Sequence, residues 1–207
     1  MNTSSHTEPA LTLRDRFKTA TRAAILEAAA SSFASDGATG VRMEDIAARA
    51  GIAVGTLYNY FQDRSTLVGA VLELRIRALL DGLDAAVNVD APFRERLGRF
   101  VQALAGHFEA NRPLLSILLD EERSHGHDAR TASRKRSFHR ELLARAERVL
   151  AKGVRDGALR AGDPGAYAAL LVGMVRGMVS STLTGQARFG DAASEIVSVF
   201  LNGAGRR

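Results

Sequence analysis

Apolar residues recur every three to four positions along almost the whole chain of 207 residues. Stretches in which apolar and polar residues alternate, the pattern of a half-buried β-strand, are nearly absent. Because a spacing of three to four places side chains on one face of an α-helix, the sequence predicts an all-α fold of about nine helices. Helix ends are marked by Gly37, Gly51, Gly157 and Gly185, and new helices by Asp90-Ala91-Pro92 and Asp163-Pro164.

The predicted helices belong to three parts of the chain. Residues 1–12 are expected to form a flexible tail, residues 13–63 a helix-turn-helix domain of three helices, and residues 64–207 a larger helical bundle. The expected bounds are 15–35, 43–50, 54–60, 64–87, a helix that starts at 92, 111–122, a helix that follows Gly126 and ends at 156, 164–183, and 191–202.

Composition excludes several classes of protein. With 46% hydrophobic and 25% charged residues, the chain is typical of folded globular proteins and not of disordered ones. The absence of cysteine excludes disulfide scaffolds, thiolate zinc sites and cysteine nucleophiles. The first thirteen residues have neither the basic start nor the apolar run of a secretory signal, so a cytoplasmic location is expected.

The segment 164–183 is apolar around most of its circumference, which is typical of a deeply buried helix or of a membrane span. Arg176 lies near its middle among glycines and serines, and a charge at that depth disfavours a span. We therefore expect a buried helix and no membrane association.

The net charge of +5 permits a polyanionic partner without requiring one. Residues 1–64 carry seven basic and seven acidic side chains, so a nucleic-acid site there must depend on the placement of its groups. Residues 123–160 carry eleven basic and four acidic side chains along one long helix, a pattern typical of a solvated face.

The segment 43–61, MEDIAARAGIAVGTLYNYF, has the form of a helix-turn-helix. Ala47 and Ala50 are small enough for the two helices to cross closely, and Gly51 allows the left-handed backbone of a sharp turn. Leu57 and Phe61 are expected to lie in the shared apolar contact with Ile46 and Ile52. The second helix leaves on its outside small or hydrogen-bonding residues suited to the major groove of DNA: Val54, Gly55, Thr56, Tyr58, Asn59 and Tyr60.

Together with TRAAILEAAASSFASDG at 21–37, the segment DIAARAGIAVGTLYNYFQDR at 45–64 resembles the TetR family of bacterial transcriptional regulators. The resemblance implies a homodimer whose N-terminal units bind a palindromic double-stranded DNA operator, by default as a repressor. It also implies a C-terminal half that dimerises and binds a small-molecule effector.

The same resemblance assigns roles to single residues. It places Thr56, Tyr58 and Tyr60 where the family contacts phosphates or base edges, and Arg64 at the phosphate-binding start of the fourth helix. For the two tyrosines the alternative is core packing with a solvated hydroxyl. Asn59 carries the donor and acceptor that fit an adenine edge.

Two positions depart from the family pattern. Arg42 stands where a Ser or Thr usually caps the second helix, and Ala53 stands where a Ser often opens the third. We expect both caps to be lost. Arg42 is expected to contact a phosphate through its guanidinium, with a merely solvated side chain as the alternative.

The C-terminal half offers an interior for an apolar or amphipathic effector, although simple core packing is the alternative for each of its residues. The last two helices carry more apolar surface than one chain covers, which predicts a four-helix bundle with a second copy. His107 and Arg176 would each need a partner if buried, and for Arg176 this is either a structural one, such as Glu195 across the dimer, or a ligand. The candidate effector-binding residues are Phe100, Leu104, His107, Phe108, Leu118, Phe138, Leu142, Met174 and Met178. The candidate interface residues are Leu171, Val175, Ile196, Val197 and Phe200.

No cofactor or metal is expected, because His125, His127 and Asp128, with His139 downstream, lack the spacing of a ligand set on one helix face. Paired Glu-x-x-His sites, a glycine-rich phosphate loop and a recognisable Ser-His-Asp grouping are absent, so an enzyme is not expected. The alternative to an effector-controlled regulator is a DNA-binding protein with an architectural or division-linked role and a protein partner.

Overall fold

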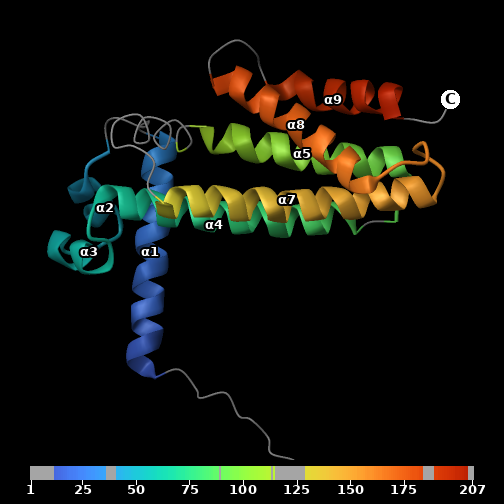
Figure 1. Cartoon of the computed structure of the whole chain (residues 1–207). Coiled ribbons are helices and arrows are strands. Elements are labelled where there is room, and N and C mark those ends of the chain that lie inside the picture. The colour runs from blue at the N-terminus through green and yellow to red at the C-terminus, as the bar shows by residue number, and fades with distance from the viewer. Residues whose placement is uncertain are drawn as a thin grey trace, which may run out of the picture. The chain divides into compact units, whose positions relative to one another are not determined.

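The computed structural model describes residues 12–35, 41–88, 90–112, 114, 129–183 and 189–204. These residues form eight helices and no strand, which confirms the all-α prediction (Figure 1). The helices are α1 (Leu13–Ser35), α2 (Met43–Arg49), α3 (Val54–Tyr60), α4 (Arg64–Val87), α5 (Phe93–Ala110), α7 (Ala129–Arg155), α8 (Pro164–Leu183) and α9 (Phe189–Ala204). Most of the helix predicted over 111–122 lies outside the described residues.

Helix ends follow the capping chemistry of the sequence, with one exception. Gly51 and Gly157 have φ of 69° and 72°, the left-handed conformation that ends α2 and α7. The Asp163 carboxylate accepts hydrogen bonds from the Gly165 and Ala166 amides at 3.0 and 3.2 Å, so it caps α8 as predicted. At α5 the expected Asp90 cap is wrong, because the helix begins after Pro92 without a side-chain cap.

The chain divides into two compact units, 1–71 and 72–207. The division lies inside α4 and not at its start, because Leu67, Val68 and Val71 in its first two turns are buried residues of the first unit. The core of this unit is formed by α1 to α3 and the start of α4, and its largest fully buried side chains are Ile25, Phe33, Ile46, Leu57, Phe61 and Leu67.

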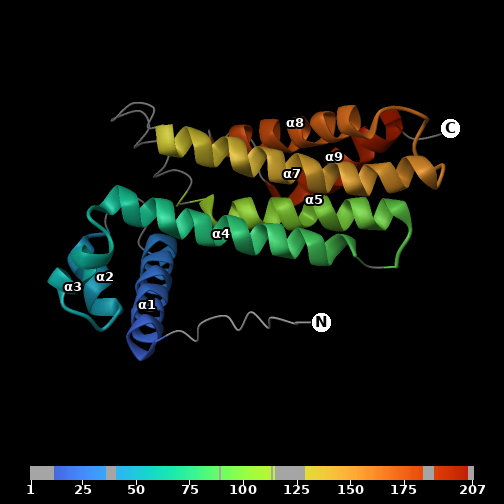
Figure 2. The same cartoon turned by 60° about the horizontal axis from the view of Figure 1, so that its bottom comes forward.

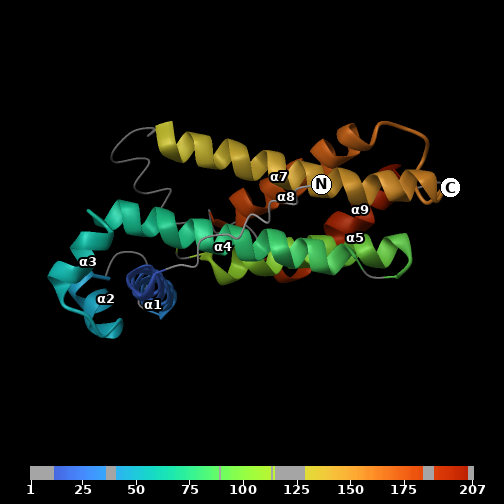
Figure 3. The ribbon, with the colours of Figure 1, turned by 90° about the horizontal axis from the view of Figure 1, so that it is seen from below.

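The second unit is a bundle of α5, α7, α8 and α9 with the rest of α4. In Figure 2, α4, α7 and α9 follow the chain in one direction and α5 and α8 in the other. Figure 3 shows the same bundle from below, with α7 and α4 running lengthwise. None of the helices in the described residues is long and apolar enough to cross a membrane.

The predicted interface residues belong to this core instead. Leu171, Val175, Ile196, Val197 and Phe200 are at most 6% exposed within a single chain, where they pack with residues of α5 and α7. Their assignment to a contact with a second copy is therefore wrong. A helix that is apolar around its circumference does not reveal from sequence which side faces its own chain, and here α5, α7 and α9 cover Leu171, Val172 and Val175 of α8.

The buried arginine of this unit is also not the expected one. Arg176 is exposed and so has no need of a buried partner. Arg96, in the first turn of α5, is only 6% exposed, and its guanidinium lies 3.5 Å from the carboxylate of Asp156 just beyond α7. This ion pair joins the start of α5 to the end of α7.

Candidate nucleic-acid interface

The turn between α2 and α3 is closed by backbone hydrogen bonds. The Gly51 amide donates to the Ala48 carbonyl at 3.1 Å, and the Ile52 amide donates to the Ala47 carbonyl at 3.0 Å. This is the pattern of a helix that ends on a left-handed glycine. It confirms the role predicted for Gly51 and sets the direction in which α3 leaves.

α3 buries one of its seven residues and displays the rest. Leu57 is fully buried, whereas Tyr58 is 45% exposed and Gly55 and Asn59 are exposed as well. The other predicted DNA-contacting residues of this helix, Val54, Thr56 and Tyr60, are half-buried. Tyr58 is therefore not packed in the core, whereas half-burial of Tyr60 agrees with both a DNA contact and core packing of its ring.

The caps of the two short helices differ. At α3 the prediction is confirmed, since Ala53 makes no side-chain hydrogen bond to the helix start. At α2 the Asp45 carboxylate accepts a hydrogen bond from the Arg42 amide at 3.2 Å. This is the half of a capping box in which the third residue of the helix binds the backbone of the N-cap residue. The acidic residue three positions after the cap is the signal that could have predicted it. The Arg42 side chain is 76% exposed and lies 3.5 Å from Glu44.

Two arginines pack on aromatic rings at the edges of the helix-turn-helix. The Arg64 guanidinium lies 5.6 Å from the centre of the Phe33 ring, and that of Arg22 lies 5.4 Å from the centre of the Phe61 ring. Such cation–π contacts hold a long side chain in one place. Arg22 is an addition that sequence reasoning missed, because the contact joins α1 to the residue that follows α3.

The start of α4 is held by Asp63. Its carboxylate accepts a hydrogen bond from the Thr66 amide at 2.7 Å, and this bond together with one from the Thr66 side chain lowers the pKa of Asp63. The carboxylate thus stays ionised and caps α4 beside Arg64. The Asp-x-x-Thr spacing could have predicted this cap.

The exposed face of α3 offers hydroxyl, amide and backbone groups and no carboxylate. In protein–DNA complexes, groups of this kind contact phosphates and donate or accept hydrogen bonds at base edges. Within the described residues no group of three or more His, Cys, Asp and Glu side chains has the arrangement of a metal site. His125, His127 and Asp128 lie outside the described residues.

A cavity of about 430 Å³ lies between α4 and α7 in the second unit. Phe138 is the one candidate effector-binding residue that lines it. Phe100, Leu104 and Leu142 are buried in the core and do not line this cavity. Phe108, Met174 and Met178 are half-buried against that core, and Leu118 lies outside the described residues. The lining residues are Glu73, Ile76, Arg77, Leu80, Asp81, Arg134, Ser137, Phe138, Glu141 and Arg145.

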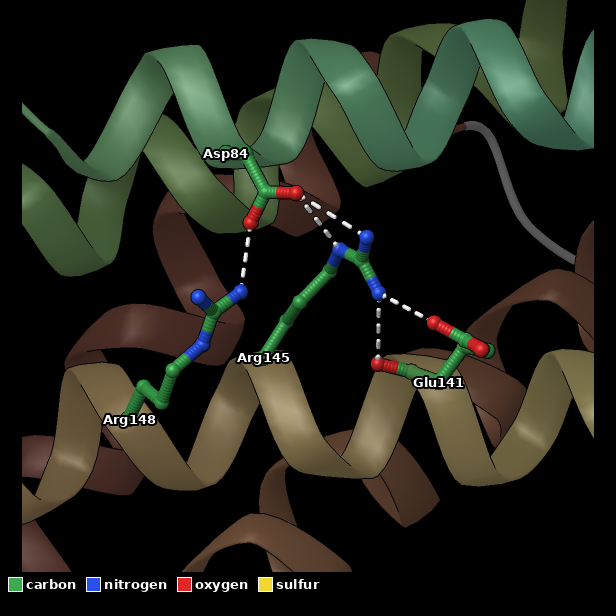
Figure 4. Close-up of polar contacts among 4 residues, drawn as sticks. All are labelled: Asp84, Glu141, Arg145 and Arg148. Carbon is green, nitrogen blue, oxygen red and sulfur yellow. Dashed lines mark hydrogen bonds and ion pairs between the residues drawn. The ribbon is translucent and has the colours of Figure 1, made fainter. Parts of the chain in front are cut away.

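Ion pairs join the two helices beside this cavity (Figure 4). Asp84 of α4 lies between two arginines of α7: its carboxylate oxygens are 2.9 Å from the Arg145 guanidinium and 2.5 Å from that of Arg148. Arg145 also lies 2.7 Å from Glu141. Burial lowers the pKa of Arg145, but its hydrogen bonds to Glu141 and Asp84 outweigh that effect and raise it. At the other end of the cavity Arg134 lies 2.9 Å from Glu73.

Two family models match the chain. Residues 25–71 match the model described as bacterial regulatory proteins of the tetR family, and residues 90–180 match the tetracyclin repressor-like C-terminal domain. Among curated proteins, the HTH-type transcriptional regulator YhgD of Bacillus subtilis is 24% identical over 68% of this chain and 72% of its own length. The HTH-type transcriptional regulator Mb2274c of Mycobacterium bovis is 27% identical over 76% of this chain and 79% of its own.

Solved structures share the fold. A transcriptional regulator from Cytophaga hutchinsonii superposes with a TM-score of 0.75 at 22% identity, over 88% of this chain and 97% of that one. SmeT, solved as a complex with triclosan, has a TM-score of 0.68 at 23% identity, over 90% and 92% of the two chains. NalD of Pseudomonas aeruginosa, described as the secondary repressor of the MexAB-OprM multidrug efflux pump, has a TM-score of 0.59 at 21% identity, over 92% and 98%.

His107 generates a prediction about pH. Burial, and secondarily the charge of Arg75, lower the pKa of His107 from an ordinary value of 6.5 to about 4. Between these values the unfolded chain binds a proton that the folded chain does not, so the free energy of unfolding falls as the pH falls from about 6.5 to about 4. Between pH 7 and pH 5, the free energy of unfolding measured with urea should fall by less in His107→Gln than in the unmodified protein. The exposed His139→Gln is the control, and equal losses in all three proteins would contradict the prediction.

Proposed function

Since the chain belongs to the TetR family of DNA-binding transcriptional regulators, which are not enzymes, we propose that it is a ligand-released repressor that binds a palindromic double-stranded DNA operator as a homodimer. The observation that carries the proposal is α3, a short helix that buries Leu57 and displays Tyr58 and Asn59. An operator lies on the chromosome, so the proposal also places the protein in the cytoplasm.

The groups of the first unit divide into two kinds of DNA contact. Asn59 is exposed on α3 and is the group fitted to a bidentate contact with an adenine edge. Tyr58, Thr56 and Tyr60 supply hydroxyls to phosphates, as do the guanidiniums of Arg42 and Arg64. Val54 and the exposed backbone at Gly55 let α3 come close to the groove floor, since a Cβ built at Gly55 meets no atom within 4 Å. Phosphate contacts orient the protein, and base-edge contacts select the sequence.

The dimer we propose uses the exposed sides of α8 and α9. Leu170 on α8 is 62% exposed and Val199 on α9 is 55% exposed. Gly173 and Gly177 lie three and seven positions after Leu170 on the same exposed side. Glycines on that side let a second copy of α8 approach closely, and the two pairs of helices would form a four-helix bundle.

The effector we propose is an amphipathic molecule that binds in the cavity between α4 and α7. Ile76, Leu80 and Phe138 supply apolar surface for its body, and Arg77 and Asp81 supply charges for its polar end. The volume of the cavity, about 430 Å³, is within the range of small-molecule sites. SmeT, a protein of the same fold, was solved as a complex with triclosan, which supports a small molecule as the effector.

Release of DNA requires that the ligand alter α4. This helix begins at Arg64 in the DNA-binding unit and reaches Asp84, where Arg145 and Arg148 of α7 hold it. A ligand beside Arg145 that shifts this contact needs a coupling of only about 1–3 kcal/mol to weaken operator binding from several-fold to about a hundred-fold.

The first prediction of the proposal concerns base recognition. In fluorescence-anisotropy titrations, the protein is expected to prefer the DNA that flanks its own gene over a shuffled duplex of equal length. Asn59→Ala should lose about 1–3 kcal/mol on the flanking DNA, because it removes a base contact, and little on the shuffled duplex. The exposed Asn88→Ala, at the end of α4, is the matched control. Equal and weak binding of both duplexes by the unmodified protein would favour the architectural or division-linked role instead.

The second prediction concerns the dimer. Gly173→Arg places a long charged side chain on the exposed side of α8 without an internal clash, because a Cβ there meets no atom within 4 Å. Sedimentation velocity should find the unmodified protein dimeric and Gly173→Arg monomeric, with unchanged helix content by circular dichroism. Gly106→Arg, at another exposed glycine with open space in α5, is the control and should remain dimeric. A dimeric Gly173→Arg protein would place the interface elsewhere.

The third prediction locates the effector. The chain contains no tryptophan, so Phe138→Trp introduces a single fluorophore at the cavity wall. A panel of amphipathic compounds that includes triclosan should contain molecules that release the operator DNA and change the emission of this tryptophan in a saturable way over the same concentrations. Glu109→Trp, at an exposed position of α5 that belongs to the second unit and does not line the cavity, is the control and should not respond. Release of DNA without any change at position 138 would place the effector site outside this cavity.

A further inference from the structure

The first half of α1 has no buried side chain. Burial in this helix begins at Ile25, and residues 13–24 are exposed apart from the half-buried Thr21. Within the first unit this half of α1 extends past α2 and α3 (Figure 1). The match to the N-terminal family model also begins at residue 25. The segment 13–24 is therefore an extension that the core of the helix-turn-helix domain does not require.

This extension is nevertheless specified as a helix. The Thr12 hydroxyl donates to the Asp15 carboxylate at 2.6 Å, the Asp15 amide donates to the Thr12 hydroxyl at 3.2 Å, and the Thr12 amide donates to the Asp15 carboxylate at 3.3 Å. These reciprocal bonds form a capping box, a local signature of a helix start. Solvated helical turns gain little stability from packing, so a cap at this position points to a role for the extension itself.

The extension carries a row of three cations. Arg14, Lys18 and Arg22 are four residues apart, so they lie along one side of the helix over about 12 Å. All three are exposed, and among the described residues none of them forms an ion pair. Arg16 lies on the opposite side of the helix. We call Arg14, Lys18 and Arg22 the basic row.

The basic row is joined to the end of the recognition helix. The Arg22 guanidinium lies 5.4 Å from the centre of the Phe61 ring, and Phe61 is the residue that ends α3. Arg22 is therefore beside the C-terminal end of α3, and Lys18 and Arg14 continue the row away from it along α1. When α3 lies in a major groove, the row starts at the edge of that groove and follows the direction of α1.

We propose that the basic row binds the sugar-phosphate backbone of DNA beyond the base pairs contacted by α3. The proposal rests on the proposed function, in which α3 enters the major groove. Regularly spaced cations on a solvated helix suit a polyanion, since each neutralised phosphate releases condensed counterions. Phosphates carry no sequence information, so the row adds affinity and salt dependence without selecting bases.

Leu13 and Phe17 give the extension a small apolar side as well, at 68% and 66% exposure. A basic helix with an apolar side is also typical of membrane-surface helices. The contact of Arg22 with Phe61 favours DNA, because it starts the row beside the C-terminal end of the helix that we propose to enter the major groove. Anionic lipid is therefore one of the outcomes that the experiment has to separate.

The test removes two charges and leaves the contact with Phe61 in place. Arg14→Gln/Lys18→Gln keeps long side chains with good helix propensity. Arg16→Gln/Arg140→Gln removes the same net charge from the far side of α1 and from an exposed position in α7. Both double variants and the unmodified protein are titrated by anisotropy against the flanking DNA and a shuffled duplex, at salt concentrations between 50 and 200 mM.

For Arg14→Gln/Lys18→Gln we expect the slope of log Kd against log salt to decrease by about two on both duplexes. Raising the salt fourfold should therefore weaken DNA binding by the double variant about tenfold less than it weakens DNA binding by the unmodified protein. The preference for flanking over shuffled DNA should stay the same, unlike in Asn59→Ala. The control double variant should change the slope by less than half as much.

Three results would overturn the proposal. One is an unchanged slope in Arg14→Gln/Lys18→Gln, and another is an equal change in the control, which would reduce the effect to net charge. The third is binding to phosphatidylserine vesicles that the double variant loses while its DNA slope is unchanged, which would assign the row to a membrane surface. If the unmodified protein shows no preference for the flanking DNA, the proposal of sequence-specific operator binding fails. The salt dependence of binding to the shuffled duplex still tests the basic row in that case.

Discussion

The burial of Leu57 is the constraint on which the DNA-facing surface depends. α3 has seven residues, and a helix of that length does not persist alone in water. Its conformation is held because Leu57 and Phe61 are buried with Ile46, and because the turn at Gly51 sets its direction. Because these residues anchor the helix, Tyr58 and Asn59 are not needed for its packing and remain exposed. The same ring of Phe61 carries Arg22, so one buried cluster orients both the recognition helix and the first cation of the extension.

The distribution of charge shows why net charge is a poor guide to a DNA-binding surface. The basic excess of residues 123–160 suggests a polyanion site, yet several of its cations serve the bundle. Arg145 and Arg148 hold Asp84 of α4, and Arg134 holds Glu73. The electrically balanced first 64 residues, in contrast, place three exposed cations in a row along α1, and the last of them, Arg22, lies beside the end of α3. Position relative to the folded helices decides which charges are available to a partner.

Most of the helix bounds could be predicted, because caps and breakers are local. Gly51, Gly157 and the carboxylate of Asp163 act where the sequence places them, while Asp90 does not, since Pro92 already sets the start of α5. The helix-turn-helix and its exposed residues followed from a motif of 19 residues whose geometry is local too. The interface and effector residues could not be predicted in this way, because periodicity identifies apolar side chains but not the element that covers them.

By itself the sequence determined the all-α class, the positions of the helices, the family and the outward face of α3, since these depend on contacts between residues close along the chain. Only the tertiary structure decided that Val175 and Phe200 belong to the core of one chain, that Arg96 is buried and Arg176 is not, and that residues of α4 and α7, several of them charged, line a cavity. The physical reason is that burial and ion pairing in a bundle join residues far apart in sequence. Asp84 and Arg145 are an example, since their charges are neutralised only when α4 and α7 lie side by side.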